Sequence, residues 1–237
     1  MTRRTRNTPG MVMLGMATIA CIGLTACGNG DDTGDSDVAL ADDAAMAEKT
    51  PQTAALNIAD GPGVCLDAAA EKLGPDAKIA EVMTNFSVGS DIESRDDKPA
   101  GTVTYCMVQY QDPADPRKLL QSSMAGDTGT FGEPAPVEIT VTGDASTFNI
   151  EDMLIRLGDV DYAALDRTLA SLEPKLADAY QPHAWEFVKF TGPDAFQAGH
   201  HFRIGAKGRL KTNDIQDTGQ VVIAPDGTTV LDDRLVS

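Results

Sequence analysis

The chain has few residues of the kinds that most often carry chemistry. Its 237 residues include three histidines, His183, His200 and His201, and they contain no HExxH zinc motif. A GxSxG elbow, a phosphate-binding Walker loop and a kinase signature are also absent. Adjacent histidines in a strand point to opposite faces, so His200 and His201 would not easily ligate one metal ion. We therefore expect no catalytic residues, no metal and no cofactor; a metal site that joins His183, one of that pair and a carboxylate is an alternative.

Positive charge is scarce. The chain has 19 Lys and Arg against 36 Asp and Glu, a net charge of −17. Residues 1–26 hold three arginines and no acid, so removing them leaves 16 cations against 36 acids, a net charge near −20. Such a chain repels phosphate and anionic lipid, which argues against a nucleic-acid partner. It would attract cations or a basic protein, although plain solubility also explains the charge.

The sequence has no apolar run long enough to span a bilayer. Its longest run, residues 11–24, has 14 residues, whereas about 20 are needed for ~30 Å of hydrocarbon. Arg3, Arg4 and Arg6 precede it, and a basic head followed by a short apolar stretch is typical of a secretory signal. The Arg3-Arg4 pair is also compatible with a twin-arginine signal, but polar residues follow it where hydrophobic ones are expected.

The end of this signal, Leu24-Thr25-Ala26-Cys27, resembles the lipobox of bacterial lipoproteins. The resemblance implies that residues 1–26 are removed and that Cys27 is acylated as the first residue of the mature chain. The protein would then be anchored to a membrane by lipid and face the periplasm or the cell exterior. Gly28 follows the cysteine where an Asp would resemble an inner-membrane retention signal, which favours the outer membrane if the source is Gram-negative.

Only two of the four cysteines are free to pair. Cys21 leaves with the signal and Cys27 takes the lipid, which leaves Cys65 and Cys106. Two thiols in an oxidising compartment usually form a disulfide. Closing a loop of about 40 residues would stabilise the fold by ~4 kcal/mol. A nucleophile or metal ligand is the alternative, but no CxxC spacing supports it.

Large apolar residues are almost missing from residues 27–56. Seven acids in this segment face only Lys49. The segment cannot bury enough surface to offset its ordering entropy, so we predict a flexible acidic tether. The spacing of Asp31 to Asp37 resembles a calcium loop, but the closing Glu of an EF-hand does not follow.

Residues 57–158 are predicted to form a first α+β lobe. An apolar stripe predicts a helix over residues 64–73, ended by Gly74-Pro75. Strands are expected at residues 79–88 and 102–110, so a Cys65–Cys106 bridge would join helix to sheet. Asp115-Pro116 predicts the start of a short helix. Alternation over residues 137–141 predicts a half-buried strand, and another is expected near 148–157.

Residues 159–237 are predicted to form a second lobe. Asp161 is expected to cap a helix, and Pro174 should kink or split it. Four leucines lie at helical spacing along this helix: Leu165, Leu169, Leu172 and Leu176. Strands are expected at residues 184–190, 200–204 and 221–224, followed by a hairpin turn at 225–228 and a return strand at 229–231. The predicted class is α+β, with helices packed on an antiparallel sheet in two similar helix-plus-meander lobes.

The order of a helix followed by a meander, ending in the run Gly219-Gln220-Val221-Val222-Ile223-Ala224-Pro225-Asp226-Gly227, is similar to small inhibitory modules of the PepSY and BLIP-like families. The likeness covers about 75 C-terminal residues and departs at Pro174. It implies a protein that binds and inhibits another protein, and it assigns no site residue.

Aromatic residues make up only 5% of the chain, yet several fall in predicted strands. Tyr105 and Tyr110 share one strand. In another, Trp185, Phe187 and Lys189 are predicted to share one face, while Val188 and Phe190 share the other. A strand that is apolar on both faces is buried on both sides, or a partner covers one face. Trp185 and Phe187 are therefore candidates for a binding face as well as for the core.

Together these features predict a lipid-anchored, non-catalytic module that binds a protein. The most specific hypothesis is an inhibitor or immunity protein against a basic secreted or envelope enzyme. Its acidic residues would steer the encounter, and an apolar strand or loop would block the cleft of the enzyme. The first alternative is a small-ligand or lipid-binding module for envelope assembly, with an apolar pocket between helix and sheet. The second alternative is a hydrolase, which needs a carboxylate of perturbed pKa in a cleft.

Overall fold

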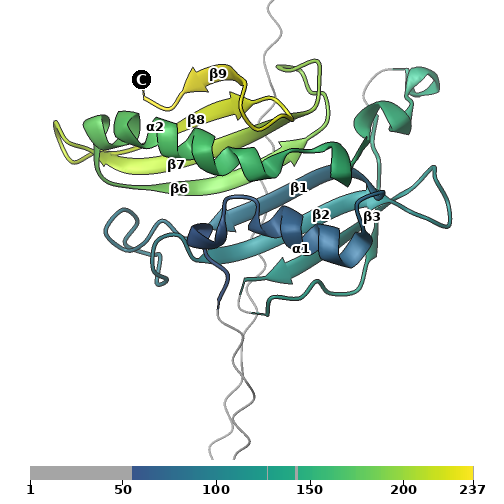
Figure 1. The fold of residues 1–237 in the computed structure, drawn as a ribbon, viewed down its shortest axis with the longest axis horizontal. Helices are drawn as coiled ribbons and strands as arrows, with labels where there is room; N and C mark the ends of the chain where they lie inside the picture. The colour runs from purple at the N-terminus through teal and green to yellow at the C-terminus, as the bar shows by residue number, and fades with distance from the viewer. Residues whose placement is uncertain (1–54, 127, 142–143, 237) are drawn as a thin grey trace, which may run out of the picture. The chain divides into compact units, whose positions relative to one another are not determined.

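A computed structural model describes residues 55–126, 128–141 and 144–236 (Figure 1). The predicted signal, the predicted lipidation residue Cys27 and the predicted tether up to residue 54 lie outside the described residues. The described residues belong to one compact unit. No helix in the described part of the chain combines the length and apolar character needed to cross a bilayer.

The body is built on one antiparallel sheet of nine strands in the order β4-β3-β2-β1-β6-β7-β8-β9, with β5 beside β1. The strands are β1 Lys78–Phe86, β2 Val103–Gln111, β3 Leu119–Ala125, β4 Ala135–Val137, β5 Ile155–Arg156, β6 Tyr180–Thr191, β7 His201–Leu210, β8 Gln216–Ile223 and β9 Val230–Arg234. The two α-helices are α1 Val64–Leu73 and α2 Leu165–Ala179, and both lie on the same side of the sheet (Figure 1). The predicted α+β class and antiparallel sheet are confirmed, with the sheet dominating.

The chain runs twice through a helix followed by an antiparallel meander. The first run is α1 with β1 to β4, and the second is α2 with β6 to β9. The first strands of the two runs, β1 and β6, pair in the middle of the sheet, from Glu81 opposite Thr191 to Asn85 opposite Phe187. The two runs therefore share one sheet. The domain boundary at residue 158 and the similarity of the two lobes stay predictions.

One hydrophobic core includes side chains from both helices and from the sheet. The apolar stripes predicted for the two helices lie in it: Val64, Leu66 and Ala69 from α1, and Leu165, Leu169 and Leu176 from α2. They meet strand residues that alternate along the sheet, among them Val82, Val108, Phe190, Ile204 and Val221. Burying each such side chain contributes about 1.5–3 kcal/mol, so this layer accounts for most of the stability of the fold.

The prediction of a short helix at Asp115-Pro116 is wrong. The Asp115 carboxylate accepts hydrogen bonds from the backbone N–H and the guanidinium of Arg117, which closes a turn. The strand β3 begins directly after it and was not predicted. Its polar centre, Gln121-Ser122-Ser123, has little strand propensity, and pairing with β2 orders it instead.

Three further predictions in the middle of the chain are wrong. The half-buried strand predicted over residues 137–141 ends at Val137, where β4 ends. The strand predicted near 148–157 is a 3₁₀ turn, Ile150–Met153, followed by the two residues of β5. The Asn149 side chain accepts a hydrogen bond from the Glu151 N–H, which favours the turn. Asp161 makes no capping hydrogen bond, because a 3₁₀ turn, Tyr162–Ala164, comes before α2.

Pro174 does not split the helix, because α2 continues through it; a kink at this position stays a prediction. Proline removes the hydrogen bond to the carbonyl of Ala170. Both residues lie on the exposed side of the helix, where water can satisfy that carbonyl.

The hairpin predicted at 225–228 is present. The Asp226 carboxylate accepts hydrogen bonds from the N–H groups of Thr228 and Thr229, and these bonds lower the pKa of Asp226 to about 2.

Candidate functional site

The predicted disulfide is present and joins α1 to β2. Cys65 and Cys106 are fully buried, and their Cα atoms lie 5.7 Å apart. Both residues belong to the main core, so the bridge fixes the helix on the sheet from inside. Its position points to a structural role.

A β-bulge separates the two aromatic residues predicted to share a binding face. Trp185 lies opposite Ala206 and packs against the main core, whereas Phe187 lies opposite Gly205. Glu186 is the extra residue between them, so the strict alternation assumed from the sequence fails. Val188 and Phe190 share one face, as predicted, and that face packs in the main core. Phe187 therefore stays on the opposite face, without Trp185.

We call the side of the sheet opposite the α-helices the open face. Strand alternation places on this face the strand residues that do not enter the main core. The register aligns them in two neighbouring rows that cross β2, β1, β6, β7 and β8. The first row is Tyr105, Asn85, Phe187, Gly205 and Gln220, and the second is Met107, Met83, Lys189, Arg203 and Val222. Neither α-helix of the described residues covers this face (Figure 1). Two aromatics, two methionines and several amides make it an amphipathic surface.

Charges on the open face are paired with one another. Lys189 lies 2.8 Å from Glu81, and Arg203 lies 2.8 Å from Asp194 in the loop between β6 and β7. Arg234 pairs with Asp232. Amides and hydroxyls are also joined, since Gln109 donates to Gln121 at 3.1 Å. The open face is therefore close to electrically neutral. Its charged and amide side chains are held in place by these contacts, which lowers the conformational entropy that they lose when a partner binds.

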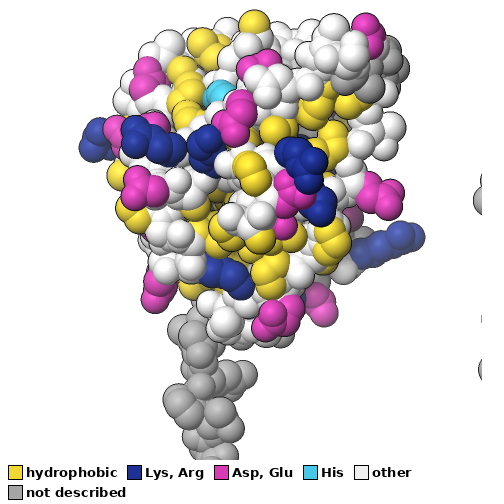
Figure 2. Space-filling model, turned by 90° about the vertical axis from the view of Figure 1, so that its right-hand side faces the viewer, with side chains coloured by type: hydrophobic (Ala, Val, Ile, Leu, Met, Phe, Trp, Pro, Cys, Tyr) yellow, Lys and Arg dark blue, Asp and Glu magenta, His cyan; other side chains and the backbone are white. Residues whose placement is uncertain are grey.

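A hollow of about 300 Å³ lies on the open face beside Phe187. Its lining includes Glu186, Thr218, Gln220 and Arg234 in addition to the aromatic ring. It offers an apolar wall with a carboxylate and a guanidinium at its rim. Elsewhere on the surface, as in the side view of Figure 2, positive and negative side chains are interspersed among apolar ones.

The loop between β1 and β2, residues 87–102, is built around one carboxylate. Asp96 accepts hydrogen bonds from the Ser87 hydroxyl and from the N–H groups of Val88, Gly89 and Lys98. Burial by itself would raise the pKa of Asp96, but these hydrogen bonds outweigh it and hold the pKa below its ordinary value. The loop thus has a fixed shape.

The same loop is fastened to the strands of the second run. Lys207 donates to Glu93 at 2.6 Å, and Arg209 donates to the backbone carbonyls of Asp91 and Ile92. Ile92 is 2% exposed, so the loop is packed as well as hydrogen-bonded. These contacts link segments more than 110 residues apart.

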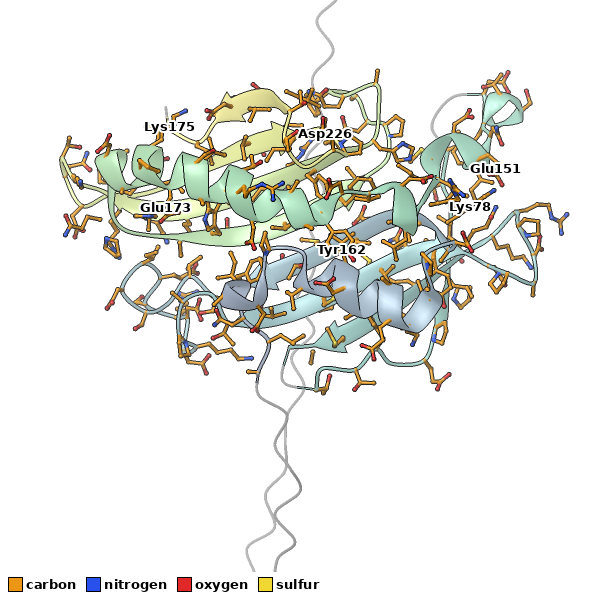
Figure 3. The ribbon with its side chains drawn as sticks, in the orientation of Figure 1. Lys78, Glu151, Tyr162, Glu173, Lys175 and Asp226 are labelled. Atoms are coloured by element: carbon orange, nitrogen blue, oxygen red, sulfur yellow. A yellow bond between two sulfur atoms is a disulfide. The ribbon has the colours of Figure 1, made fainter. Side chains whose placement is uncertain are left out.

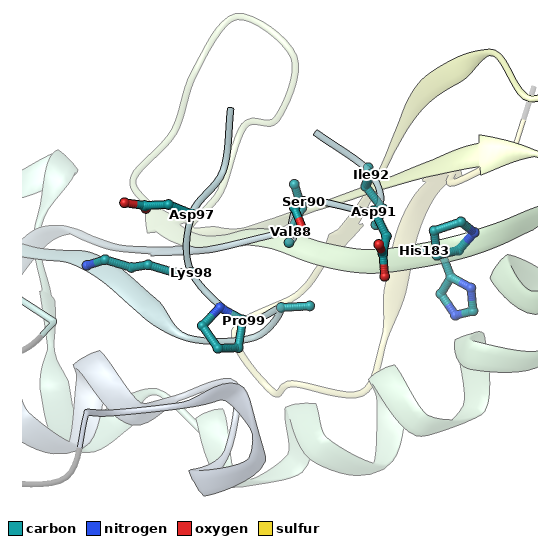
Figure 4. A pocket seen from close by; sticks show the side chains of 11 residues that line it. Val88, Ser90, Asp91, Ile92, Asp97, Lys98, Pro99 and His183 are labelled. Carbon is teal, nitrogen blue, oxygen red and sulfur yellow. The ribbon is translucent and has the colours of Figure 1, made fainter. Parts of the chain in front are cut away.

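A second hollow, of about 370 Å³, lies between this loop and the start of β6 (Figure 4). Val88, Ile92 and Pro182 give it apolar walls, and Asp91 and His183 supply polar groups. The Nε2 atom of His183 lies 2.6 Å from Oε1 of Glu173, which projects from α2 (Figure 3). Asp91 and Glu173 were not singled out from the sequence, because nothing local distinguishes them among 36 acids.

The three histidines are not brought together. His183 lies beside Glu173, His200 stacks on Phe190, and His201 is fully buried with Nδ1 3.0 Å from the carbonyl oxygen of Gly199. Among residues 55–126, 128–141 and 144–236, no group of three or more His, Cys, Asp and Glu side chains is placed to hold a metal ion. Ser90 also lines the second hollow, but no hydrogen bond joins its hydroxyl to His183 within this part of the chain, so no Ser-His-Glu triad is assembled.

No protein-family model and no curated protein sequence matches the chain. Among solved structures, a candidate lipoprotein from Clostridium difficile 630 is similar, with 12% sequence identity and a TM-score of 0.41. The likeness covers 77% of this chain and 94% of that chain.

Proposed function

We propose that this chain is an envelope lipoprotein, anchored at Cys27, whose body binds a basic partner protein through the open face without catalysing a reaction. An inhibitor of a basic envelope or secreted enzyme is the most specific form of the proposal. The lipobox-like run before Cys27 supports the anchor, and a lipoprotein anchored there would hold its body outside the cytoplasm. The small-ligand module and the hydrolase remain the alternatives.

The observation that carries the binding role is the composition of the open face. An antiparallel sheet can leave one face to water, and that face is then usually polar. Here Phe187, Tyr105 and Met83 are partly exposed on this face, beside Met107 and Val222, which are buried although they lie outside the main core. Aromatic and methionine side chains rimmed by paired charges are typical of protein-binding surfaces.

The charge of the body supports a basic partner. Residues 57–237 hold 15 of the cations and 29 of the acids, a net charge of −14. Because the charges of the open face are paired locally, the excess acids lie elsewhere and act over distance. Such a field speeds the encounter with a cationic protein, and salt weakens it.

A pull-down tests the binding role. The mature chain with Cys27→Ser is used to capture proteins from envelope extract at low and high salt, beside the variants Phe187→Ala and Phe148→Ala. Phe148 is a matched control, because it is exposed but lies outside the rows of the open face. We expect a basic protein that is lost at high salt, depleted by Phe187→Ala and retained by Phe148→Ala. Capture that is equal in both variants would contradict the proposed surface.

Fractionation of cells tests the anchor. The wild-type chain should sediment with membranes, and its N-terminal peptide should carry acyl chains on Cys27. The Cys27→Ser chain should lose both the acyl mass and the processing at residue 26. A wild-type chain that is cleaved elsewhere, or that reaches the membrane fraction without acylation, would overturn the assignment.

A further inference from the structure

One aromatic side chain beside the open face is left largely in water. Phe196, in the loop between β6 and β7, is 77% exposed, and the next most exposed large apolar side chain among the described residues, Ile215, is 59% exposed. A single exposed apolar residue is ordinary on a protein surface. A role for Phe196 therefore has to come from the way in which its ring is held.

The Asp194 side chain fixes the turn that carries Phe196. Its carboxylate accepts hydrogen bonds from the backbone N–H groups of Phe196 at 2.7 Å and Gln197 at 2.9 Å. The N–H group of Asp194 donates to the carbonyl of Gln197 at 2.8 Å. Burial by itself would raise the pKa of Asp194, but the backbone hydrogen bonds and the positive charge of Arg203 outweigh it and hold the pKa below its ordinary value. The carboxylate is therefore ionised at neutral pH, and the turn keeps its shape.

Arg203 connects this turn with the open face. Its guanidinium donates to Asp194 at 2.8 Å, and its Cζ atom lies over the Phe196 ring, 5.9 Å from the ring centre, in a cation–π contact. Arg203 belongs to the second row of the open face, between its register partners Lys189 and Val222. The ring thus lies at the margin of the open face. Because the backbone and the guanidinium that hold it are both fixed, less conformational entropy is lost when a partner covers the ring.

The turn brings no net charge to this margin. Residues 191–203 contain one acid and one Lys or Arg, Asp194 and Arg203, and these two form an ion pair. A ring presented without an unpaired charge suits an apolar pocket, since no isolated ion has to leave water when the ring enters. Attraction of a basic partner comes instead from acids elsewhere on the body, whose net charge is −14.

We propose that Phe196 docks into an apolar pocket of the basic partner protein while the partner's surface covers the open face. A few aromatic side chains that fill pockets of the partner carry most of the affinity in many protein interfaces. The proposal rests on the proposed function, since it names the feature of the partner that is recognised. In the inhibitory form of that function, the Phe196 ring occupies a pocket in the cleft of the enzyme.

Photocrosslinking tests the contact. The mature Cys27→Ser chain with p-benzoylphenylalanine in place of Phe196 is irradiated in envelope extract, beside a chain that carries the same group in place of Ile215. Ile215 is a matched control, because it is an exposed apolar residue in the turn between β7 and β8, at the other end of β7. We expect an adduct with a basic protein from position 196 alone. Mass spectrometry should map the link to apolar residues of that protein.

The affinity of the same basic protein gives a second measurement. Phe196→Ala should weaken its binding by about tenfold or more, and tenfold corresponds to ~1.4 kcal/mol. Ile215→Ala should leave the affinity unchanged. Because the Phe196 ring is largely exposed, the melting temperature of Phe196→Ala should equal that of the wild type, so a loss of binding would not come from misfolding.

The proposal is overturned if Phe196→Ala binds the partner as tightly as the wild type, or if position 196 links to a second copy of the chain. It is also overturned if the Cys27→Ser chain sediments with phosphatidylcholine vesicles and Phe196→Ala abolishes that binding, because the ring would then enter lipid.

Failure of this proposal is distinguishable from failure of the proposed function. A partner that is lost by Phe187→Ala but retained by Phe196→Ala would leave the binding role of the open face standing and refute the docking of Phe196. A partner that is lost by Phe196→Ala but retained by Phe187→Ala would support the docking of Phe196 and refute the open face. No captured protein and no adduct from position 196 would refute both.

Discussion

The ring of Phe187 in β6 lies over Gly205 in β7, so closely that a Cβ atom added to Gly205 would lie 2.2 Å from Cε1 of Phe187. The two residues are register partners on the open face. Any side chain at position 205 would lift the aromatic ring away from the sheet. The absence of a side chain there thus lets the Phe187 ring lie directly against β7.

Gly205→Ala is expected to destabilise the fold by about 1–3 kcal/mol, because the ring and the added methyl cannot occupy the same space. Urea unfolding followed by tryptophan fluorescence would measure the change. Gly199→Ala is the control, since nothing lies within 4 Å of the position that its Cβ would take. Equal stability of the two variants would show that Phe187 moves aside at no cost.

Removing the disulfide by the double substitution Cys65→Ala and Cys106→Ala should lower the free energy of unfolding by about 4 kcal/mol in the chain-entropy account. The two cysteines are 41 residues apart in sequence, and the unfolded chain regains the freedom of that loop. Calorimetry of the double variant beside the wild type gives the difference. A wild type that is no more stable than the double variant would mean that the bridge only follows a helix position fixed by packing.

Asp96→Asn should destabilise the protein by about 1–3 kcal/mol at neutral pH, since the charged acceptor of several hydrogen bonds is lost. Because folding lowers the pKa of Asp96 below its ordinary value of 3.8, its contribution is fully present above that value. The contribution is lost as the pH falls through the lower pKa of the folded state. The gap between wild type and variant should therefore shrink in acid.

Unfolding in urea at neutral pH and below pH 4 measures that gap. Asp97→Asn is the neighbouring control, because Asp97 is exposed at the surface of the same loop. A gap that stays constant with pH would show that shape, and not charge, makes Asp96 important.

Pro174→Ala should raise the stability by about 1–3 kcal/mol, because alanine restores the hydrogen bond to Ala170 and suits a helix interior better. Part of the gain is offset by the greater freedom of the unfolded chain. Thermal unfolding is the measurement. A decrease in melting temperature would mean that Pro174 supports α2 in a way that its exposed position does not reveal.

Features that depend on neighbours a few residues away could be predicted from the sequence. The helix over residues 64–73 has the predicted bounds, because its apolar stripe and the Gly74-Pro75 stop are both local. The turn at Asp226-Gly227 is equally local, since the carboxylate bonds the next residues. The pairing of Cys65 with Cys106 could be predicted by elimination, because the lipobox resemblance assigns Cys21 to the signal and Cys27 to the lipid.

The candidate sites could be predicted only in part. Phe187 was found because an aromatic residue beside apolar neighbours in a strand is a visible pattern, but the bulge at Glu186 that turns Trp185 into the core leaves no mark in the sequence. The strand β3 escaped for a related reason, since its polar centre is ordered only by pairing with β2.

The sequence alone determined the α+β class, the position of most strands and the charge of the protein, since each follows from composition or from short periodic patterns. The tertiary structure decided which face each aromatic occupies, and it decided that Asp91, His183 and Glu173 meet at one hollow. These residues come from a loop, a strand and a helix up to 92 positions apart. Their meeting depends on the order and register of strands in the sheet, which are set by the packing of the whole core.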